Sequence, residues 1–327
     1  MAKTVAIIGA GQIGYAAADA FRDRGWDVTV YARTKPNWFD GTLHKFQPYE
    51  VGEAAAPSAD IVFDSIAFDR GDVARYCPDR VGRLIAISSA SVYCDDQGRT
   101  FDEAVQNGFP EFDGAIDEDQ STVAPGPETY STRKVRMENK ALEMFGDRAT
   151  IFRPCAIYGK HSRHPREWWF VKRLIDGRTR IPLIEGGTSR FQPTDVEDIS
   201  CFAVDAAEQE LSGAYNIATE DCPTVLQIGQ ILADFLDYDP EFVPSDQTGL
   251  VGRTPWSVPK PFVVSGRKMI ETGYDPPSSY WSGMFVFLPW LRDLNPTDWR
   301  KTFPQLAAYP WDLFDYEAED RLFDERH

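Results

Sequence analysis

A tyrosine and a lysine four residues apart form the most informative chemical pattern in the chain. Tyr130 and Lys134 stand at the two ends of Tyr-Ser-Thr-Arg-Lys, and residues four apart lie on the same face of a helix. A phenol with an ordinary pKa of about 10 is a poor acid–base group at neutral pH, but a nearby ammonium favours the phenolate and lowers that pKa. The pair therefore indicates proton transfer, although the spacing alone is common.

Further motifs surround this pair in a fixed order. Upstream, the apolar strand candidate 84–87 runs into Ser-Ser-Ala-Ser-Val-Tyr at 88–93. Downstream come Arg-Pro-Cys-Ala-Ile-Tyr-Gly at 153–159, Asp-Val-Glu-Asp-Ile at 195–199 and Ala-Tyr-Asn-Ile-Ala at 214–218. The combination and its order are more specific than any one of these motifs.

A glycine-rich turn near the start of the chain is suited to the phosphates of a dinucleotide. Gly9, Gly11 and Gly14 fit G-x-G-x-x-G between a strand pattern and a helix pattern, which is the context that the motif needs. Gln12 and Ile13 fall at the start of the helix, whose free N–H groups and partial positive charge favour phosphate. We expect these five residues to bind a dinucleotide cofactor.

The end of the second strand indicates which dinucleotide is preferred. A site for NAD(H) usually has an acidic residue there, which accepts hydrogen bonds from the ribose hydroxyls. This chain has Arg33 and Lys35 instead, and both could pair with a 2′-phosphate. The alternative is that both are solvated charges of a surface loop and bind no phosphate. We therefore expect NADP(H) to be preferred over NAD(H).

The ordered set of motifs resembles the extended short-chain dehydrogenases/reductases, the NAD-dependent epimerase/dehydratase-like family, over roughly residues 4–275. The resemblance implies that Ser89 holds the substrate oxygen, that Tyr130 is the general acid–base, and that Lys134 binds the nicotinamide ribose and depresses the tyrosine pKa. It implies hydride transfer between the nicotinamide and a carbonyl carbon. The other residues that it assigns are Ser65 and Pro154 for the cofactor and Ser91 for the substrate.

Several departures from that family pattern are informative. The family mostly has G-x-x-G-x-x-G, whereas this chain has G-x-G-x-x-G. The acidic residue that usually follows the third strand in the family is not identifiable within 43–55. Ala90 and Ser91 replace the Asp-Glu pair of sugar-nucleotide dehydratases, which disfavours dehydration. The stretches 60–68 and 190–196 resemble an atypical subgroup that includes chloroplast stem-loop RNA-binding proteins, but this chain keeps the serine, tyrosine and lysine.

Strand and helix patterns alternate along most of the chain. This alternation predicts an α/β fold, a Rossmann-type doubly wound parallel sheet with a smaller C-terminal substrate lobe. We expect 1–158 with 192–220 to form the NADP(H)-binding domain, and 159–191 with 221–327 to form the substrate-binding lobe. The expected strands are 5–8, 27–31, 61–63, 84–87, 150–152 and 214–217; the clearest helix patterns are 15–24 and 131–145.

The net charge of −17 over 327 residues is concentrated in two segments. Residues 95–120 hold nine acidic side chains and one arginine, and residues 312–327 hold seven acidic side chains and two arginines. The remainder is nearly balanced. This distribution argues against a nucleic-acid partner.

The composition also bears on compartment and partners. No run is long and apolar enough for a membrane span, and the N-terminus lacks a signal-peptide pattern, so we expect a cytoplasmic protein without a membrane partner. Five cysteines without a CxxC pair imply neither disulfides nor zinc, and we expect no metal. The resemblance implies a homodimer through the helix that bears Tyr130 and its neighbour.

Basic residues in the second half are candidates for binding the substrate. Arg163 and Arg166 lie in the run 159–166 and could bind a carboxylate or phosphate, or could equally be solvated charges. The resemblance suggests that Arg190 contacts a pyrophosphate, although it lies one residue further from Val196 than the family pattern requires.

Two other segments leave their roles open. Trp281, Trp290 and Trp299 could form an aromatic wall over an apolar substrate, although packing within the lobe is the commoner use of such residues. The acidic insert 95–120 starts and ends near the candidate catalytic residues. It could be a lid, a subunit contact or a disordered loop.

Three functions are compatible with these patterns. The first is an NADP(H)-dependent oxidoreductase that interconverts a ketone or aldehyde and an alcohol on a small-molecule, biosynthetic substrate. The second is an NAD(P)-dependent sugar-nucleotide epimerase that oxidises and re-reduces one carbon. The third is a non-catalytic NADP(H)-binding regulatory protein.

Overall fold

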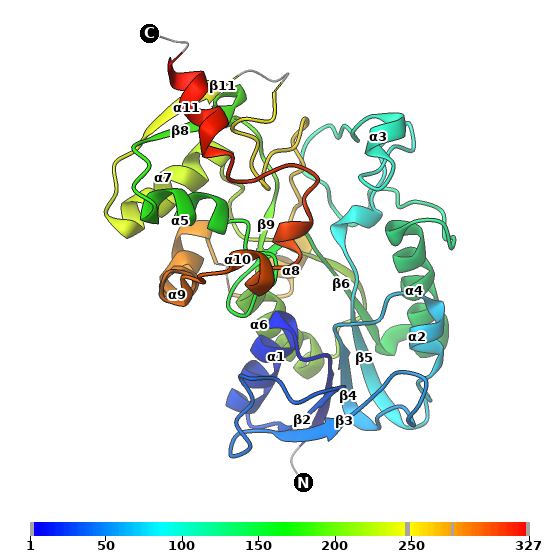
Figure 1. Ribbon diagram of the computed structural model, residues 1–327. Coiled ribbons are helices and arrows are strands. Elements are labelled where there is room, and N and C mark those ends of the chain that lie inside the picture. Colours follow the sequence, from blue (N-terminus) through cyan, green and yellow to red (C-terminus); the bar gives the residue numbers. More distant parts are fainter. Residues whose placement is uncertain (1–2, 246–248, 276–277, 325–327) are drawn as a thin grey trace. The chain divides into compact units, whose positions relative to one another are not determined.

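The computed structural model describes residues 3–245, 249–275 and 278–324 (Figure 1). The chain divides into two compact units: the first contains Met1–Ile157, Thr194–Glu220 and Val264–Pro277, and the second contains Tyr158–Pro193, Asp221–Val263 and Ser278–His327. The segment 264–275 thus packs with the first unit, whereas the substrate-binding lobe expected from the sequence included every residue from 221 onward. The functional assignment of the two parts stays a prediction.

A seven-stranded sheet in which every pairing is parallel forms the centre of the first unit, in the order β10-β6-β5-β4-β1-β2-β3. The chain winds outward from β1 in both directions, which makes the sheet doubly wound and confirms the predicted fold class. Its strands are β1 (Thr4–Ile8), β2 (Asp27–Ala32), β3 (Lys45–Pro48), β4 (Ala59–Asp64), β5 (Val81–Ile87), β6 (Ala149–Pro154) and β10 (Gly213–Ile217).

Alternating apolar side chains of these strands build a core on each face of the sheet. In β1, Val5 and Ile7 join the core under two helices, and Ala6 and Ile8 join the core on the opposite face. The first face is covered by α1 (Gln12–Asp23) and α6 (Val196–Glu208), and the second by α4 (Tyr130–Phe145) and the short α2 (Arg70–Ala74). The shorter elements are α3 (Ala104–Asn107), α8 (Arg267–Glu271), and the 3₁₀ turns Ala90–Val92 and Gly146–Arg148.

All six predicted strands are present, and β3 is the strand of this sheet that the sequence reading missed. It contains Lys45-Phe-Gln-Pro at the edge of the sheet, and most of its side chains are exposed. An edge strand that buries one face poorly has no long apolar run, so its pattern resembles that of a loop.

The second unit has more helix than strand. It contains the parallel pair β8 (Arg180–Ile184) and β11 (Glu241–Ser245). Its helices are α5 (Trp168–Ile175), α7 (Val225–Leu236), α9 (Tyr280–Leu294), α10 (Trp299–Thr302) and α11 (Tyr316–Asp324), with 3₁₀ turns at Glu185–Gly187 and Leu306–Ala308. Two short strands, β7 (Ala156–Tyr158) and β9 (Pro193–Asp195), form a separate pair. None of the helices in the described ranges combines the length and apolar character that crossing a membrane requires.

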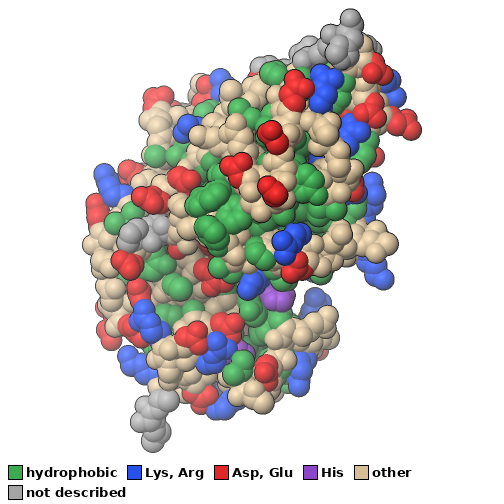
Figure 2. All heavy atoms as spheres, turned by 90° about the vertical axis from the view of Figure 1, so that its left-hand side faces the viewer, with side chains coloured by type: hydrophobic (Ala, Val, Ile, Leu, Met, Phe, Trp, Pro, Cys, Tyr) green, Lys and Arg blue, Asp and Glu red, His purple; other side chains and the backbone are tan. Residues whose placement is uncertain are grey.

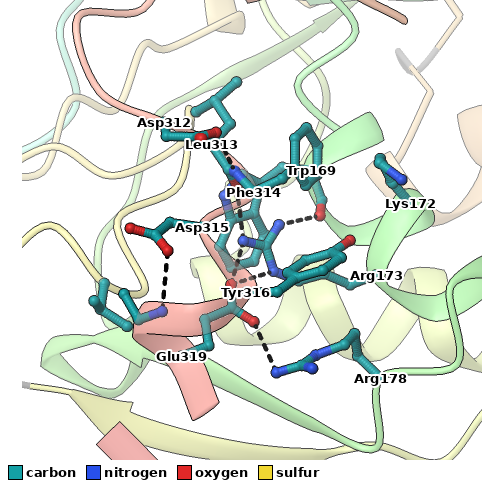
Figure 3. A network of polar contacts seen from close by, with 12 residues as sticks. Trp169, Lys172, Arg173, Arg178, Asp312, Leu313, Phe314, Asp315, Tyr316 and Glu319 are labelled. Carbon is teal, nitrogen blue, oxygen red and sulfur yellow. Dashed lines mark hydrogen bonds and ion pairs between the residues drawn. The ribbon is translucent and has the colours of Figure 1, made fainter. Parts of the chain in front are cut away.

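A buried ion pair attaches the acidic C-terminal segment to the second unit (Figure 3). The guanidinium of Arg173 in α5 donates to the carboxylate of Glu319 in α11, and both side chains are almost fully buried. The same guanidinium donates to the carbonyls of Trp169 and Leu313 at 2.8 and 2.7 Å and lies 3.5 Å from the centre of the Trp169 ring. Part of the negative charge of residues 312–327 thus has a structural role.

Candidate active site

The glycine turn between β1 and α1 has the geometry that its sequence motif predicts. Gly9 has a φ of +102°, and a Cβ there would lie 2.4 Å from the Ser65 hydroxyl. A Cβ at Gly14 would lie 2.0 Å from the carbonyl oxygen of Gly9. These two glycines are therefore required for α1 to approach the strands. The contact also places Ser65, another predicted cofactor residue, beside the turn.

The third glycine faces open space at the start of α1. Gly11 is the N-cap of the helix without a side-chain hydrogen bond, and a Cβ there would meet nothing within 4 Å. The Oε1 atom of Gln12 is buried beside it without a hydrogen-bond partner among the described residues. Open space, free helix N–H groups and an unpaired acceptor fit the phosphates and ribose of a dinucleotide.

Replacing Gly11 by alanine should weaken the binding of the dinucleotide while leaving the stability of the fold nearly unchanged. The backbone conformation of Gly11 suits any residue and its Cβ meets nothing, so the free energy of unfolding should change by less than about 0.5 kcal/mol. The added methyl would occupy the space of a phosphate, and NADPH should bind at least about tenfold more weakly by isothermal titration calorimetry. Gly71→Ala, at an equally open glycine in α2, is the control. Unchanged NADPH binding in Gly11→Ala would contradict a phosphate site at this turn.

The two basic residues that follow β2 differ in their surroundings. The side chain of Arg33 is 78% exposed, and its Nε lies 4.0 Å from the carboxylate of Glu50. The Lys35 ammonium lies over the rings of Phe39 and Phe46, at 5.1 and 5.8 Å from their centres. Arg33 is therefore the freer of the two to meet a ligand.

Two residues beside the turn were not singled out from the sequence. Glu50 follows β3 and approaches Arg33 across neighbouring strands, and recognising it requires knowing that β3 exists. The indole Nε1 of Trp38 donates to the carbonyl of Ala10 at 3.1 Å, and its ring packs edge-on against Tyr15. A tryptophan in the loop after β2 was the available signal for that contact.

The structure brings Ser89, Tyr130 and Lys134 together. Ser89 follows β5, its hydroxyl accepts from the backbone N–H of Ser91, and it lies near enough to the Tyr130 hydroxyl to lower the pKa of that group. Tyr130 is the first residue of α4, and the Lys134 ammonium lies 5.8 Å from the centre of its ring. The Thr129 N-cap fixes the start of the helix through a reciprocal hydrogen-bond pair with Thr132, and so sets the position of the tyrosine.

Lys134 is buried under the first turns of α4. Its ammonium donates to the carbonyl of Ala67, which follows β4, at 2.7 Å, and to that of Ile87, the last residue of β5, at 2.9 Å. Burial lowers the pKa of Lys134 to about 8, although Asp64 and Glu138 oppose the shift. The ammonium is thus held at the carboxyl edge of the sheet, in the same unit as the glycine turn.

The pKa of Tyr130 moves in the direction opposite to the one predicted. Desolvation of the hydroxyl raises this pKa, the hydrogen bond with Ser89 lowers it, and the charge of Asp102 raises it again. Lys134 is fixed by backbone carbonyls and does not dominate the balance, so the spacing of the pair did not determine the shift.

A buried polar network supports this region and was not anticipated. Glu138, one helical turn beyond Lys134, accepts from the Ser88 hydroxyl and from two nitrogens of Arg153. Arg153 also donates to the hydroxyl of Tyr93, which donates to Asn216 at 2.7 Å. The network joins α4 to β5, β6 and β10. It also explains why Tyr93 and Arg153 occur in the motifs.

The acidic insert 95–120 is an ordered part of the first unit rather than a disordered loop. Burial would raise the pKa of Asp95, but N–H donors from Glu111 and Arg99, among others, hold it at about 2. Asp102 accepts from the backbone N–H of Ser131 at 2.7 Å, and so reaches the first turn of α4 beside Tyr130. The insert therefore contributes a negative charge next to the candidate acid–base residue.

Replacing Asp102 by asparagine should shift the pH dependence of turnover. The Asp102 charge raises the Tyr130 pKa, so its removal lowers that pKa. In the carbonyl reduction that the family resemblance implies, the phenol must be protonated, so the alkaline limb of the rate profile should move to lower pH. Asp102 is exposed and its field is screened, so we expect a shift of at most about one pH unit in the rate profile. Asp113→Asn, elsewhere in the insert, is the control. A shift to higher pH would contradict this interpretation.

The remaining candidate residues have varied environments. Ser91 accepts from the Ser131 hydroxyl, and Pro154 ends β6 in a buried position. In the second unit, the Arg166 guanidinium lies about 5.5 Å from the ring centres of Phe191 and Trp256. The other two predicted substrate residues of that unit are exposed: Arg163 and Arg190. The substrate roles of these residues stay predictions.

The chain is similar in structure to enzymes that act on nucleotide-linked sugars. The dTDP-glucose 4,6-dehydratase from Bacillus anthracis, solved with NAD, has a TM-score of 0.64 and 14% identity, over 93% of this chain and 100% of that one. The UDP-glucose 4-epimerase from Thermus thermophilus, also solved with NAD, has a TM-score of 0.64 and 17% identity, over 89% and 99% of the two chains. This chain has the Rossmann-type α/β fold of these enzymes.

That fold agrees with the resemblance predicted from the motifs. The family model "Acetohydroxy acid isomeroreductase, NADPH-binding domain" matches residues 1–69, which contain the glycine turn and Arg33. A mitochondrial protein of Arabidopsis thaliana, NADH dehydrogenase (ubiquinone) 1 alpha subcomplex subunit 9, is 28% identical over 127 residues. The match covers 35% of this chain and 31% of that protein. The chain therefore spans less than a third of the length of this relative.

Proposed function

We propose that the chain is an NADP(H)-dependent oxidoreductase of the extended short-chain type, which interconverts a ketone or aldehyde and an alcohol on a small molecule. The observation that carries this proposal is that the structure brings Ser89 and Tyr130 close together, with the buried ammonium of Lys134 beside the Tyr130 ring. The glycine turn in the same unit supports a dinucleotide cofactor.

Each of these residues has a distinct task in the proposed reaction. Ser89 holds the substrate oxygen, Tyr130 gives it a proton or removes one, and the Lys134 ammonium holds the nicotinamide ribose. A bound nicotinamide supplies or accepts the hydride. The partial positive charge at the start of α4 favours the phenolate that Tyr130 becomes after it gives up its proton.

Sugar-nucleotide epimerisation is the second candidate, because several of the similar structures are those of epimerases. Incubation with NADPH and a panel of ketones and aldehydes distinguishes the two. Steady loss of the absorbance of the reduced nicotinamide supports the reductase. Epimerisation of a sugar nucleotide without net cofactor consumption supports the second candidate. NADPH binding without either reaction would contradict both enzymatic proposals and favour a non-catalytic binding protein.

Arg33 is the residue that we propose selects NADP(H). Its loss should weaken NADPH binding by about tenfold to a hundredfold, the value of a charge-assisted hydrogen bond, and leave NADH binding within about twofold. Titration of Arg33→Ser with both cofactors measures this. Lys35→Ser, whose ammonium lies over aromatic rings, should have a smaller effect, and Glu50→Gln should strengthen NADPH binding. Equal loss of both cofactors in Arg33→Ser would contradict the assignment.

A further inference from the structure

The helix α9 has apolar side chains on both of its faces. Its buried face contains Tyr280, Met284, Phe287 and Leu291, among others. On the opposite face, Trp281, Phe285 and Val286 are 43%, 59% and 47% exposed. A helix that is apolar all round is normally covered by protein on all sides. Among the residues that the structure describes, none covers this second face of α9 fully.

The two exposed aromatic residues form one cluster with a partly buried side chain of α7. The ring of Phe235 lies 4.5 Å from that of Trp281 and 4.7 Å from that of Phe285, measured between centres. We call Phe235, Trp281 and Phe285 the aromatic patch. Figure 2 shows apolar side chains gathered on one face of the molecule, with acidic side chains among them. Contiguous exposed aromatic groups of this kind mark interaction sites.

An open groove continues from this patch along α7. It has a volume of about 510 Å³, and its lining includes Trp281, Ile231, Gln227 and Gln230. The lining is mostly polar, so the aromatic patch is the apolar anchor and the groove offers polar partners beside it. An amphipathic helix presents both kinds of side chain to such a surface. Trp281 belongs to both features, so patch and groove form a continuous surface.

The charge around this surface is predominantly negative. The helix α7 contains no basic residue, and Asp234, Asp237 and Asp239 lie in or just beyond its last turn, where the helix dipole is also negative. Arg292 in α9 is paired with Asp293 at 2.8 Å. Arg190 lines the groove together with Asp221 and Asp234. We call these acidic residues at the edge of the groove the acidic rim. A cationic partner would complement their negative charge.

We propose that the aromatic patch and its groove are a docking surface for a cationic amphipathic helix of another protein. A second copy of this chain fits less well, because a two-fold contact would bring the aspartates of α7 toward those of its partner. An anionic membrane would repel a chain of net charge −17. A basic amphipathic helix would pack its apolar face on the aromatic patch and place its cationic side chains beside the acidic rim.

The test uses the full chain and a synthetic helical probe. The probe is a fluorescein-labelled peptide of about 18 residues, five helical turns, with leucine on one face and lysine on the other. Fluorescence anisotropy should show saturable binding that weakens as salt is added. Phe285→Ser and Trp281→Ser should weaken it at least about tenfold, because both remove exposed anchor rings. Val105→Ser, at a 96% exposed valine of the first unit, should leave it unchanged.

A charge-inverted peptide, with glutamate in place of lysine, tests the acidic rim. It should bind at least about tenfold more weakly, and the double variant Asp234→Asn/Asp237→Asn should reduce this preference. Four results would overturn the proposal: no saturable binding, equal binding of both peptides, a dimer in sedimentation velocity that Phe285→Ser dissociates, or flotation with phosphatidylglycerol vesicles that depends on Phe285.

Discussion

Replacing Tyr130 by phenylalanine should lower carbonyl turnover by at least about a hundredfold, the usual contribution of a positioned acid–base group. The phenol is the group that we propose moves the proton, and phenylalanine keeps the ring against Phe68 while removing only the hydroxyl. NADPH binding should stay within about threefold, because the glycine turn and Lys134 are unaffected. Steady-state kinetics and calorimetric titration measure the two quantities.

Matched variants make this result specific. Tyr238→Phe removes the hydroxyl of an exposed tyrosine in the second unit and should leave turnover unchanged. Ser89→Ala should reduce turnover and also shift the pH profile, because the Ser89 hydrogen bond lowers the Tyr130 pKa and its loss raises it further. Unchanged turnover in Tyr130→Phe would exclude the proposed role of the phenol, whatever the cofactor affinity.

Replacing Arg173 by alanine should destabilise the second unit by about 3–5 kcal/mol, the usual cost of breaking a buried ion pair from one side. Glu319 would keep a buried carboxylate without its main partner, and the carbonyls of Trp169 and Leu313 would lose a donor. Denaturation in urea, followed by tryptophan fluorescence, is the suitable measurement, because seven of the nine tryptophans belong to the second unit.

A double variant that removes both charges distinguishes the ion pair from simple packing. The double variant Arg173→Met/Glu319→Leu buries no unpaired charge, so it should be more stable than Arg173→Ala. Arg321→Ala, at an exposed arginine of the same C-terminal helix, should change the free energy of unfolding by less than about 0.5 kcal/mol. Equal destabilisation by Arg173→Ala and Arg321→Ala would show that the pair does not hold α11 in place.

Local sequence patterns were sufficient for most of the first unit. The apolar strands lie within β1, β2, β4, β5, β6 and β10, and the glycine spacing gives the turn that it predicts. These features depend on residues close together in the chain, where backbone geometry and side-chain periodicity act directly. The edge strand β3 was missed because it buries little, and Glu50 beyond it was missed for the same reason.

Local patterns were insufficient for the electrostatics of the candidate site. The four-residue spacing of Tyr130 and Lys134 correctly placed both side chains on one helix. It did not show that Lys134 is held by Ala67 and Ile87, or that desolvation raises the Tyr130 pKa. The sequence also did not show which side chains the three tryptophans of the predicted aromatic wall contact. Trp281 contacts Phe235, Trp290 stacks on Phe287, and Trp299 packs against Phe314.

The sequence by itself therefore determined the α/β class, the glycine turn and the serine, tyrosine and lysine that we propose act on a carbonyl. Only the tertiary structure decided what surrounds them. It placed Asp102 at Ser131, paired Arg173 with Glu319 across 146 residues, and left the aromatic patch of α7 and α9 exposed. The physical reason is that charge, burial and hydrogen bonding depend on neighbours in space, and the order of strands and helices brings those neighbours together from distant parts of the chain.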